Sequence, residues 1–210
     1  GLASLLAPML LALGMTAAAQ DSNITQQIAD LEKLLAAEPL VITQAEISRP
    51  KAKGDITLKA DVSLGGAPPL RVKLRKAEPG AEAFNNVPRY DLAAYELQKL
   101  FIDPAEYVVP PTVLRFVPRA DFAKYQPDVA RTFSSADQVL AVLQYWLSDI
   151  TVIADVYNPT RFGADPLYAR YIGQLNVLTH LIAHRDSNAG NFLIGKTPTG
   201  ARVFSIDHGV

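Results

Sequence analysis

The spacing of hydrophobic positions changes several times along the chain, and each change predicts a new element. In residues 22–40 the apolar side chains recur every three or four positions, which predicts a helix that ends at Pro39. Three β-branched or alternating runs follow, separated by turns that contain Pro and Gly, at residues 41–49, 55–64 and 70–77. This pattern is typical of antiparallel strands. We therefore expect a small sheet directly after the first helix.

The pattern after this sheet predicts mainly helices. Residues 91–101 have helical spacing, whereas residues 106–118 contain paired prolines and are expected to be extended. Residues 135–156 form a strongly apolar run with helical spacing, which predicts a long helix. Residues 165–184 predict another long helix, which begins with Asp-Pro.

The last helix leads into a polar loop between two short apolar runs, residues 191–194 and 202–207, which predict strands. This order of elements predicts an α+β fold of two lobes. The first lobe would be a small antiparallel sheet with a helix, and the second would be partial and mostly helical. The expected divisions are a leader at 1–19, a helix at 20–40, and lobes at 41–118 and 119–210.

Composition excludes several functional classes. Lys and Arg together number 20 and Asp and Glu 21, so the chain has no basic surplus of the kind that nucleic-acid binding requires. The absence of cysteine excludes disulfides, thiolate zinc sites and a cysteine nucleophile. With 49% hydrophobic residues, the chain can form a substantial core. We expect no nucleic-acid partner.

The first residues resemble a secretory signal peptide. Residues 1–19 carry no charge, are rich in leucine, and end in three alanines before Gln20, as at a small-residue cleavage site. The alternative is an uncleaved membrane anchor, because nineteen uncharged residues approach the length that spans a bilayer. Either interpretation predicts an exported protein, periplasmic or secreted, and membrane association is expected only if the leader is retained.

The candidate chemistry lies near the end of the chain, in the run "HRDSNAGN" and the later "SIDHGV". Asp186 precedes Asn191 by five residues, and Asp207 ends an apolar run and is followed by His208 and Gly209. This spacing matches a phosphoryl-transfer loop, in which the Asp positions the acceptor hydroxyl and the Asn oxygen holds Mg²⁺. The Asp-x-Gly sequence supplies a second metal ligand. Oxygen ligands are the ones that Mg²⁺ prefers.

On these motifs the chain resembles the protein-kinase-like superfamily. The resemblance implies ATP or a related nucleotide with magnesium or manganese, and a hydroxyl-bearing acceptor. It implies that Asp186 is the base or positioning residue and that Asn191 and Asp207 are the metal ligands. It also implies a strand lysine against the nucleotide phosphates and a backbone turn over them, which here contains Gly54.

Alternation in residues 70–76 sets Lys76 on the face of Leu70, Val72 and Leu74, with Lys73 on the other face. Lys76 is therefore the expected phosphate contact. Either Asp91 or Glu96 could pair with it. The run "RYDLAAYELQKLF" followed by "VVPPTV" is similar to secretory-pathway kinases of the Golgi casein-kinase type, and this resemblance favours Asp91.

Two alternatives remain open at the level of sequence. A pseudokinase-like scaffold would bind nucleotide without turnover, and the absence of a G-x-G-x-x-G loop favours it. An unrelated exported structural domain would not respond to nucleotide at all. A kinase-like fold needs further helices after Asp-His-Gly, so a truncated chain with weak activity is expected, and the acceptor stays open among proteins, sugars and small molecules.

Overall fold

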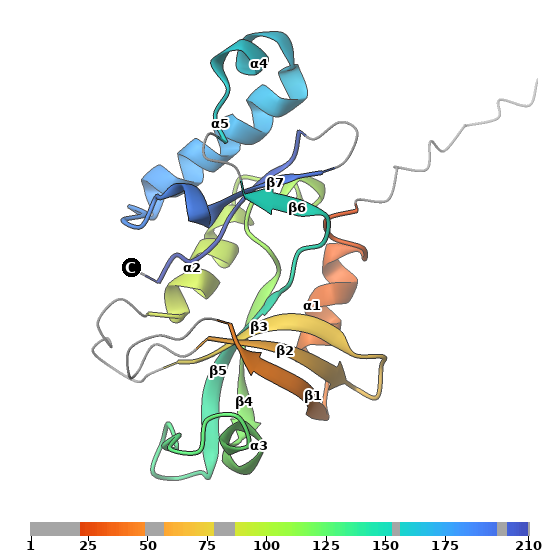
Figure 1. Ribbon diagram of the computed structural model, residues 1–210, viewed down its shortest axis with the longest axis vertical. Coiled ribbons are helices and arrows are strands. Elements are labelled where there is room, and N and C mark those ends of the chain that lie inside the picture. Colours follow the sequence, from red (N-terminus) through yellow and green to blue (C-terminus); the bar gives the residue numbers. More distant parts are fainter. Residues whose placement is uncertain (1–21, 49–56, 78–86, 153–155, 197–200, 210) are drawn as a thin grey trace, which may run out of the picture.

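The structure is an α+β fold with two antiparallel sheets, seen in Figure 1. It is a computed structural model, and it describes residues 22–48, 57–77, 87–152, 156–196 and 201–209. The larger sheet has five strands in the order β1-β2-β3-β5-β4, and the smaller has the order β6-β7-β8. The leader at 1–19 and the turn that contains Gly54 lie outside the described residues. In the described part of the chain, no helix has the length and apolarity needed to cross a membrane.

The three strands expected after the first helix are confirmed. They are β1 (Leu40–Ile47), β2 (Thr57–Leu64) and β3 (Leu70–Lys76), and they pair in antiparallel register. The proline-rich segment continues into β4 (Thr112–Pro118), as its extended pattern predicted. β-Branched and leucine side chains alternate along these strands, so one face of the sheet is apolar.

The prediction of a long helix over residues 135–156 is wrong. Residues 138–145 form β5 (Gln138–Tyr145), which lies between β3 and β4 in the larger sheet. Its last five residues are all buried because the strand is paired on both edges and covered on both faces. Such a strand has a continuous apolar run, which periodicity alone does not distinguish from a buried helix.

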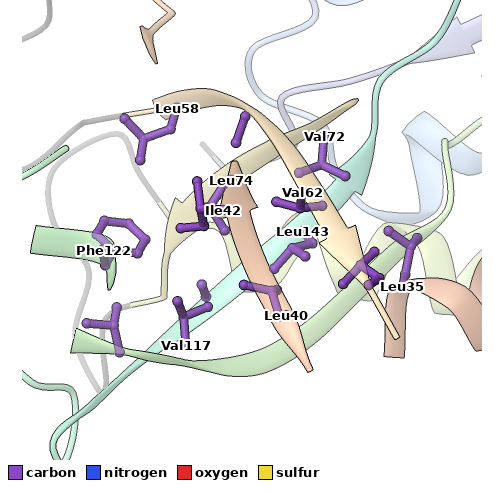
Figure 2. Packing of buried hydrophobic residues seen from close by; sticks show 14 of the residues in the cluster. Leu35, Leu40, Ile42, Leu58, Val62, Val72, Leu74, Val117, Phe122 and Leu143 are labelled. Atoms are coloured by element: carbon purple, nitrogen blue, oxygen red, sulfur yellow. The ribbon is translucent and has the colours of Figure 1, made fainter. Parts of the chain in front are cut away.

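The two faces of the larger sheet differ. One face packs against α1 (Ile28–Ala36) and α3 (Arg119–Ala123) in an apolar cluster, and Figure 2 shows Val72, Leu74 and Leu143 in it. The other face carries α2 (Arg89–Gln98), which contacts β4 and β5. In Figure 1, α2 lies between the larger sheet and α5. The sheet therefore separates an apolar core from a second, more polar interior.

The rest of the chain builds the smaller sheet and its helices. These elements are β6 (Ile150–Val152), α4 (Pro159–Ala164), α5 (Pro166–Leu181), β7 (Phe192–Gly195) and β8 (Val203–Ser205). Helix α5 and the strand character of β7 and β8 agree with the sequence pattern. The boundary expected at residue 118 does not separate the two sheets, because β5 joins the larger sheet, and the helices that follow β5 are accompanied by three short strands. Short 3₁₀ turns occur at Pro104–Glu106 and Ala189–Asn191.

The first helix is shorter than its pattern suggested. It begins at Ile28, and the preceding segment instead anchors the two sheets to each other. The Asn23 side chain is fully buried, and its Nδ2 donates to the carbonyl oxygens of Ser148 and Asp149, each at 2.9 Å. At the other end of the helix, Arg115 donates to the Leu35 carbonyl at 2.7 Å. These bonds give further partners to backbone oxygens in the link between β5 and β6 and at the end of α1.

Candidate functional site

The strand lysine in the site is Lys73, so the structure differs from the expectation for Lys76. Lys73 Nζ lies 3.2 Å from Asp91 Oδ2 and 2.5 Å from Asp207 Oδ1. Lys76 shares the alternating face of Val72 and Leu74, whose side chains enter the apolar core. The face that is most apolar in sequence is thus the core face, and the opposite face carries the charged groups.

Asp91 is the acid that pairs with the strand lysine. It lies in the first turn of α2 with no exposed surface, and it accepts hydrogen bonds from Lys73 Nζ and from the backbone N–H of His208 at 2.9 Å. Burial acts to raise the pKa of Asp91, but the charges of Lys73, His208 and Arg75 outweigh it and hold this pKa far below its usual range. Glu96, the alternative, instead pairs with Lys99 at 2.8 Å on the exposed side of the helix.

Arg75 is a second cation in the site that the sequence reasoning missed. Only 3% of its surface is exposed, and its Nη1 lies 3.4 Å from both Asp91 Oδ2 and Asp207 Oδ1. It follows Lys73 by two positions on β3, so both side chains lie on the same face. Two cations and two carboxylates thus form one charge-balanced group, in which Arg75 and Asp91 are buried and the Asp207 side chain is 39% exposed. The alternation of Lys73 and Arg75 was the signal that could have identified it.

The loop after α5 holds Asp186 through two amide side chains. Asn191 Nδ2 donates to Asp186 Oδ2 at 2.8 Å. Asn188 Nδ2 donates to Asp186 Oδ1 at 2.6 Å, and Asn188 Oδ1 accepts from the N–H of Gly190. Asn188 was not singled out from the sequence. Both oxygens of the Asp186 carboxylate are therefore oriented by neutral donors.

Asp207 follows β8 with a backbone φ of 60°, a left-handed conformation that non-glycine residues seldom adopt. Burial acts to raise its pKa, but the charge and hydrogen bond of Lys73 prevail, so the pKa of Asp207 is lowered and the carboxylate is ionised. The next residue, His208, lies with Nδ1 3.2 Å from Asp91 and Nε2 2.9 Å from Ser205 Oγ. His208 thereby joins α2 to the end of β8.

Several of these side chains line one cavity of about 400 Å³. Lys73, Asp186, Asn191 and Asp207 line it together. The remaining lining includes a largely apolar group from the end of β5, the link after it, the smaller sheet and the residue after β8: Tyr145, Trp146, Leu147, Ile150, Leu193 and Ile206. The cavity thus combines a charged region with an apolar one, as sites for small organic anions do.

Two oxygen donors in this cavity suit a hard divalent cation. Asp207 supplies an ionised carboxylate, and Asn191 supplies an amide whose Nδ2 is already bound to Asp186. Within the described part of the chain, Asn191 Oδ1 accepts no hydrogen bond and is available as a ligand. The same part contains no group of three His, Asp or Glu side chains that could hold a metal. The donor set therefore fits magnesium or manganese that completes its shell with ligand oxygens and water.

Comparison with known proteins assigns the chain to no family. The sequence matches none of the known protein families, and a search of curated proteins finds no significant match. The cavity and its side chains therefore carry the functional argument.

Proposed function

We propose that this protein is an ATP-dependent phosphotransferase of the protein-kinase-like fold that transfers phosphate to a hydroxyl acceptor. The observation that carries the proposal is the convergence of Lys73, Asp186, Asn191 and Asp207 on one cavity. These are the residue types that phosphoryl transfer requires, because its catalysis consists mostly of positioning and charge neutralisation. The cavity is also lined by both sheets, which supports the bilobal arrangement.

In the proposed reaction, the acceptor oxygen forms a bond to the γ-phosphorus while the bond from that phosphorus to the bridging oxygen of ADP breaks. Asp186 holds the acceptor hydroxyl and takes its proton. Lys73 neutralises phosphate oxygens, and Asp91, which also pairs with Arg75, keeps Lys73 in place. Asn191 and Asp207 would hold Mg²⁺ or Mn²⁺, which supplies charge neutralisation at the phosphates.

A binding-only scaffold, similar to a pseudokinase, is the second candidate. Asp207 is already paired with both Lys73 and Arg75, and a metal would have to compete with these two cations. Both candidate functions use the same cavity, so only a measurement of turnover distinguishes the scaffold from the enzyme. Export to the periplasm or the cell exterior is part of the proposal, and the only support for it is the resemblance of residues 1–19 to a signal peptide.

The test compares the full gene product with two variants. Asp207→Asn removes a proposed metal ligand, and Asp137→Asn removes an exposed carboxylate that pairs with Arg119 away from the cavity. We expect ATP with Mg²⁺ or Mn²⁺ to raise the melting temperature of the parent and of Asp137→Asn but not of Asp207→Asn, because a ligand of the folded state stabilises it.

Turnover is then measured as ADP release with a panel of proteins, peptides and sugars as acceptors. Acceptor-dependent release by the parent supports the enzyme. A metal-dependent shift without turnover supports the scaffold. The absence of any shift at millimolar nucleotide would contradict both.

A further inference from the structure

Gln144 is a buried polar side chain of the cavity that the proposed reaction does not use. It lies on β5 directly opposite Lys73 of β3, and only 2% of its surface is exposed. It lines the cavity together with Lys73. A buried amide in such a place has to have its hydrogen-bonding groups satisfied, by the protein or by a ligand.

Two hydrogen bonds determine which end of the Gln144 amide points toward Thr112. Thr112 Oγ1 lies 2.8 Å from the carbonyl oxygen of Pro110, which only accepts, so the hydroxyl donates its single proton there. The same Oγ1 lies 3.0 Å from the Gln144 amide and must accept from it. Gln144 therefore turns its NH₂ group toward Thr112. Its Oε1 accepts no hydrogen bond within the described residues.

Oε1 of Gln144 is thus an oriented acceptor on a side chain that lines the cavity. We propose that it reads the exocyclic amino group of a nucleobase and makes the cavity selective for adenine nucleotides. Guanine and hypoxanthine carry a carbonyl oxygen at the corresponding ring position, and two acceptors facing each other without a proton leave both unsatisfied.

The neighbouring side chains agree with a base at this position. Trp146, Leu193 and Ile206 line the same cavity and offer apolar and aromatic surface for a planar ring. Lys73, opposite Gln144, is placed for the phosphates. The inference rests on the proposed function, since it requires that the ligand be a nucleotide.

The test measures dissociation constants, with Mg²⁺ present, for ATP, for purine riboside triphosphate, which lacks the amino group, and for GTP. The full gene product is compared with Gln144→Met, which removes the acceptor, and with Thr112→Val, which frees the amide to turn. Gln138→Met, half-buried on the same strand and not among the cavity residues, is the matched control.

We expect the parent and Gln138→Met to bind ATP about tenfold more tightly than purine riboside triphosphate, because one hydrogen bond is lost. In Gln144→Met this preference disappears while metal-dependent binding persists, and in Thr112→Val the discrimination against GTP falls. Equal affinities in the parent, or an unchanged preference in Gln144→Met, would overturn the role of Gln144 and leave the proposed function intact. No metal-dependent binding of any of the three nucleotides would overturn both.

Discussion

The candidate site, meaning the cavity and the ion pairs next to it, has two walls that are held together by different interactions. On the sheet side, Lys73, Arg75 and Asp91 form buried ion pairs with little or no exposed surface. On the loop side, Asp186 is half-buried and is oriented by the amides of Asn188 and Asn191. The first wall depends on charge balance, and the second depends on the direction of hydrogen bonds.

Because of this difference, we expect one wall to contribute mainly to folding stability and the other mainly to catalysis. Removing one member of a buried charged group leaves an uncompensated charge, which costs about 3–5 kcal/mol of folding free energy. Removing a partly exposed carboxylate allows water to replace its hydrogen bonds, so the fold loses little. We therefore expect substitutions on the sheet side to destabilise the protein and substitutions on the loop side to reduce turnover.

The largest expected effect is that of Asp186→Ala on transfer. Loss of the residue that holds the acceptor hydroxyl should lower kcat about 10³-fold, equivalent to about 4 kcal/mol of transition-state stabilisation. The melting temperature and the nucleotide dissociation constant should stay close to those of the parent. Kinetics with saturating acceptor, alongside thermal unfolding, measure both quantities. An Asp186→Ala variant with the kcat of the parent would contradict the role assigned to this loop.

The next largest effect is that of Asp91→Ala on stability. The variant leaves Lys73 and Arg75 with one carboxylate between them, and we expect the free energy of unfolding to fall by about 3 kcal/mol. Glu96→Ala, on the exposed side of the same helix, is the control and should change little. Urea unfolding at pH 7 measures the free energy of unfolding of both variants. Equal losses in the two variants would show that the sheet-side wall is not held by charge.

The ion pairs of Asp91 also lead to a prediction of how the free energy of unfolding depends on pH. The pKa of Asp91 is lowered in the folded protein, so its contribution is present above the unfolded value of about 3.9. This contribution should be lost progressively as the pH falls below about 4. Asp91→Asn should therefore flatten the decline in unfolding free energy between about pH 4 and pH 2. An identical decline in parent and variant would contradict a lowered pKa for Asp91.

The smallest expected effect is that of Asn188→Ala. The change removes one of two donors to Asp186, and we expect kcat to fall about fivefold with an unchanged KM, since one hydrogen bond contributes about 1 kcal/mol. Asn176→Ala, exposed on α5, is the matched control. A change in KM alone would instead show that Asn188 contacts the substrate directly.

The sequence correctly predicted those elements in which the spacing of hydrophobic residues matches the side that is buried in the fold. The strands β1 to β3 and helix α5 follow from periodicity, and Asp186 and Asn191 lie together as their spacing predicted. The prediction of a helix over residues 135–156 is wrong because β5 is a central strand, paired on both edges and covered on both faces. Such a strand has a continuous apolar run in place of the alternating pattern of a half-exposed strand. Burial on both faces cannot be read from one segment alone.

The choice of Lys76 fails for a related reason. Alternation correctly divided β3 into two faces, but the more apolar face packs into the core, and the site lies on the opposite face. Arg75 and Gln144 gain their roles from strands and helices distant in sequence, which only the fold brings near. When both faces of a sheet are covered, the face that carries the functional site can be identified only from the elements that pack on each face.

The most direct measurement compares Lys73→Met with Lys76→Met in the full gene product. The two lysines lie on one strand and differ in the face on which they lie, so the pair tests where the nucleotide binds. We predict that the rise in melting temperature with ATP and Mg²⁺ persists in Lys76→Met and disappears in Lys73→Met. Loss of the rise in Lys76→Met with retention in Lys73→Met would contradict the account.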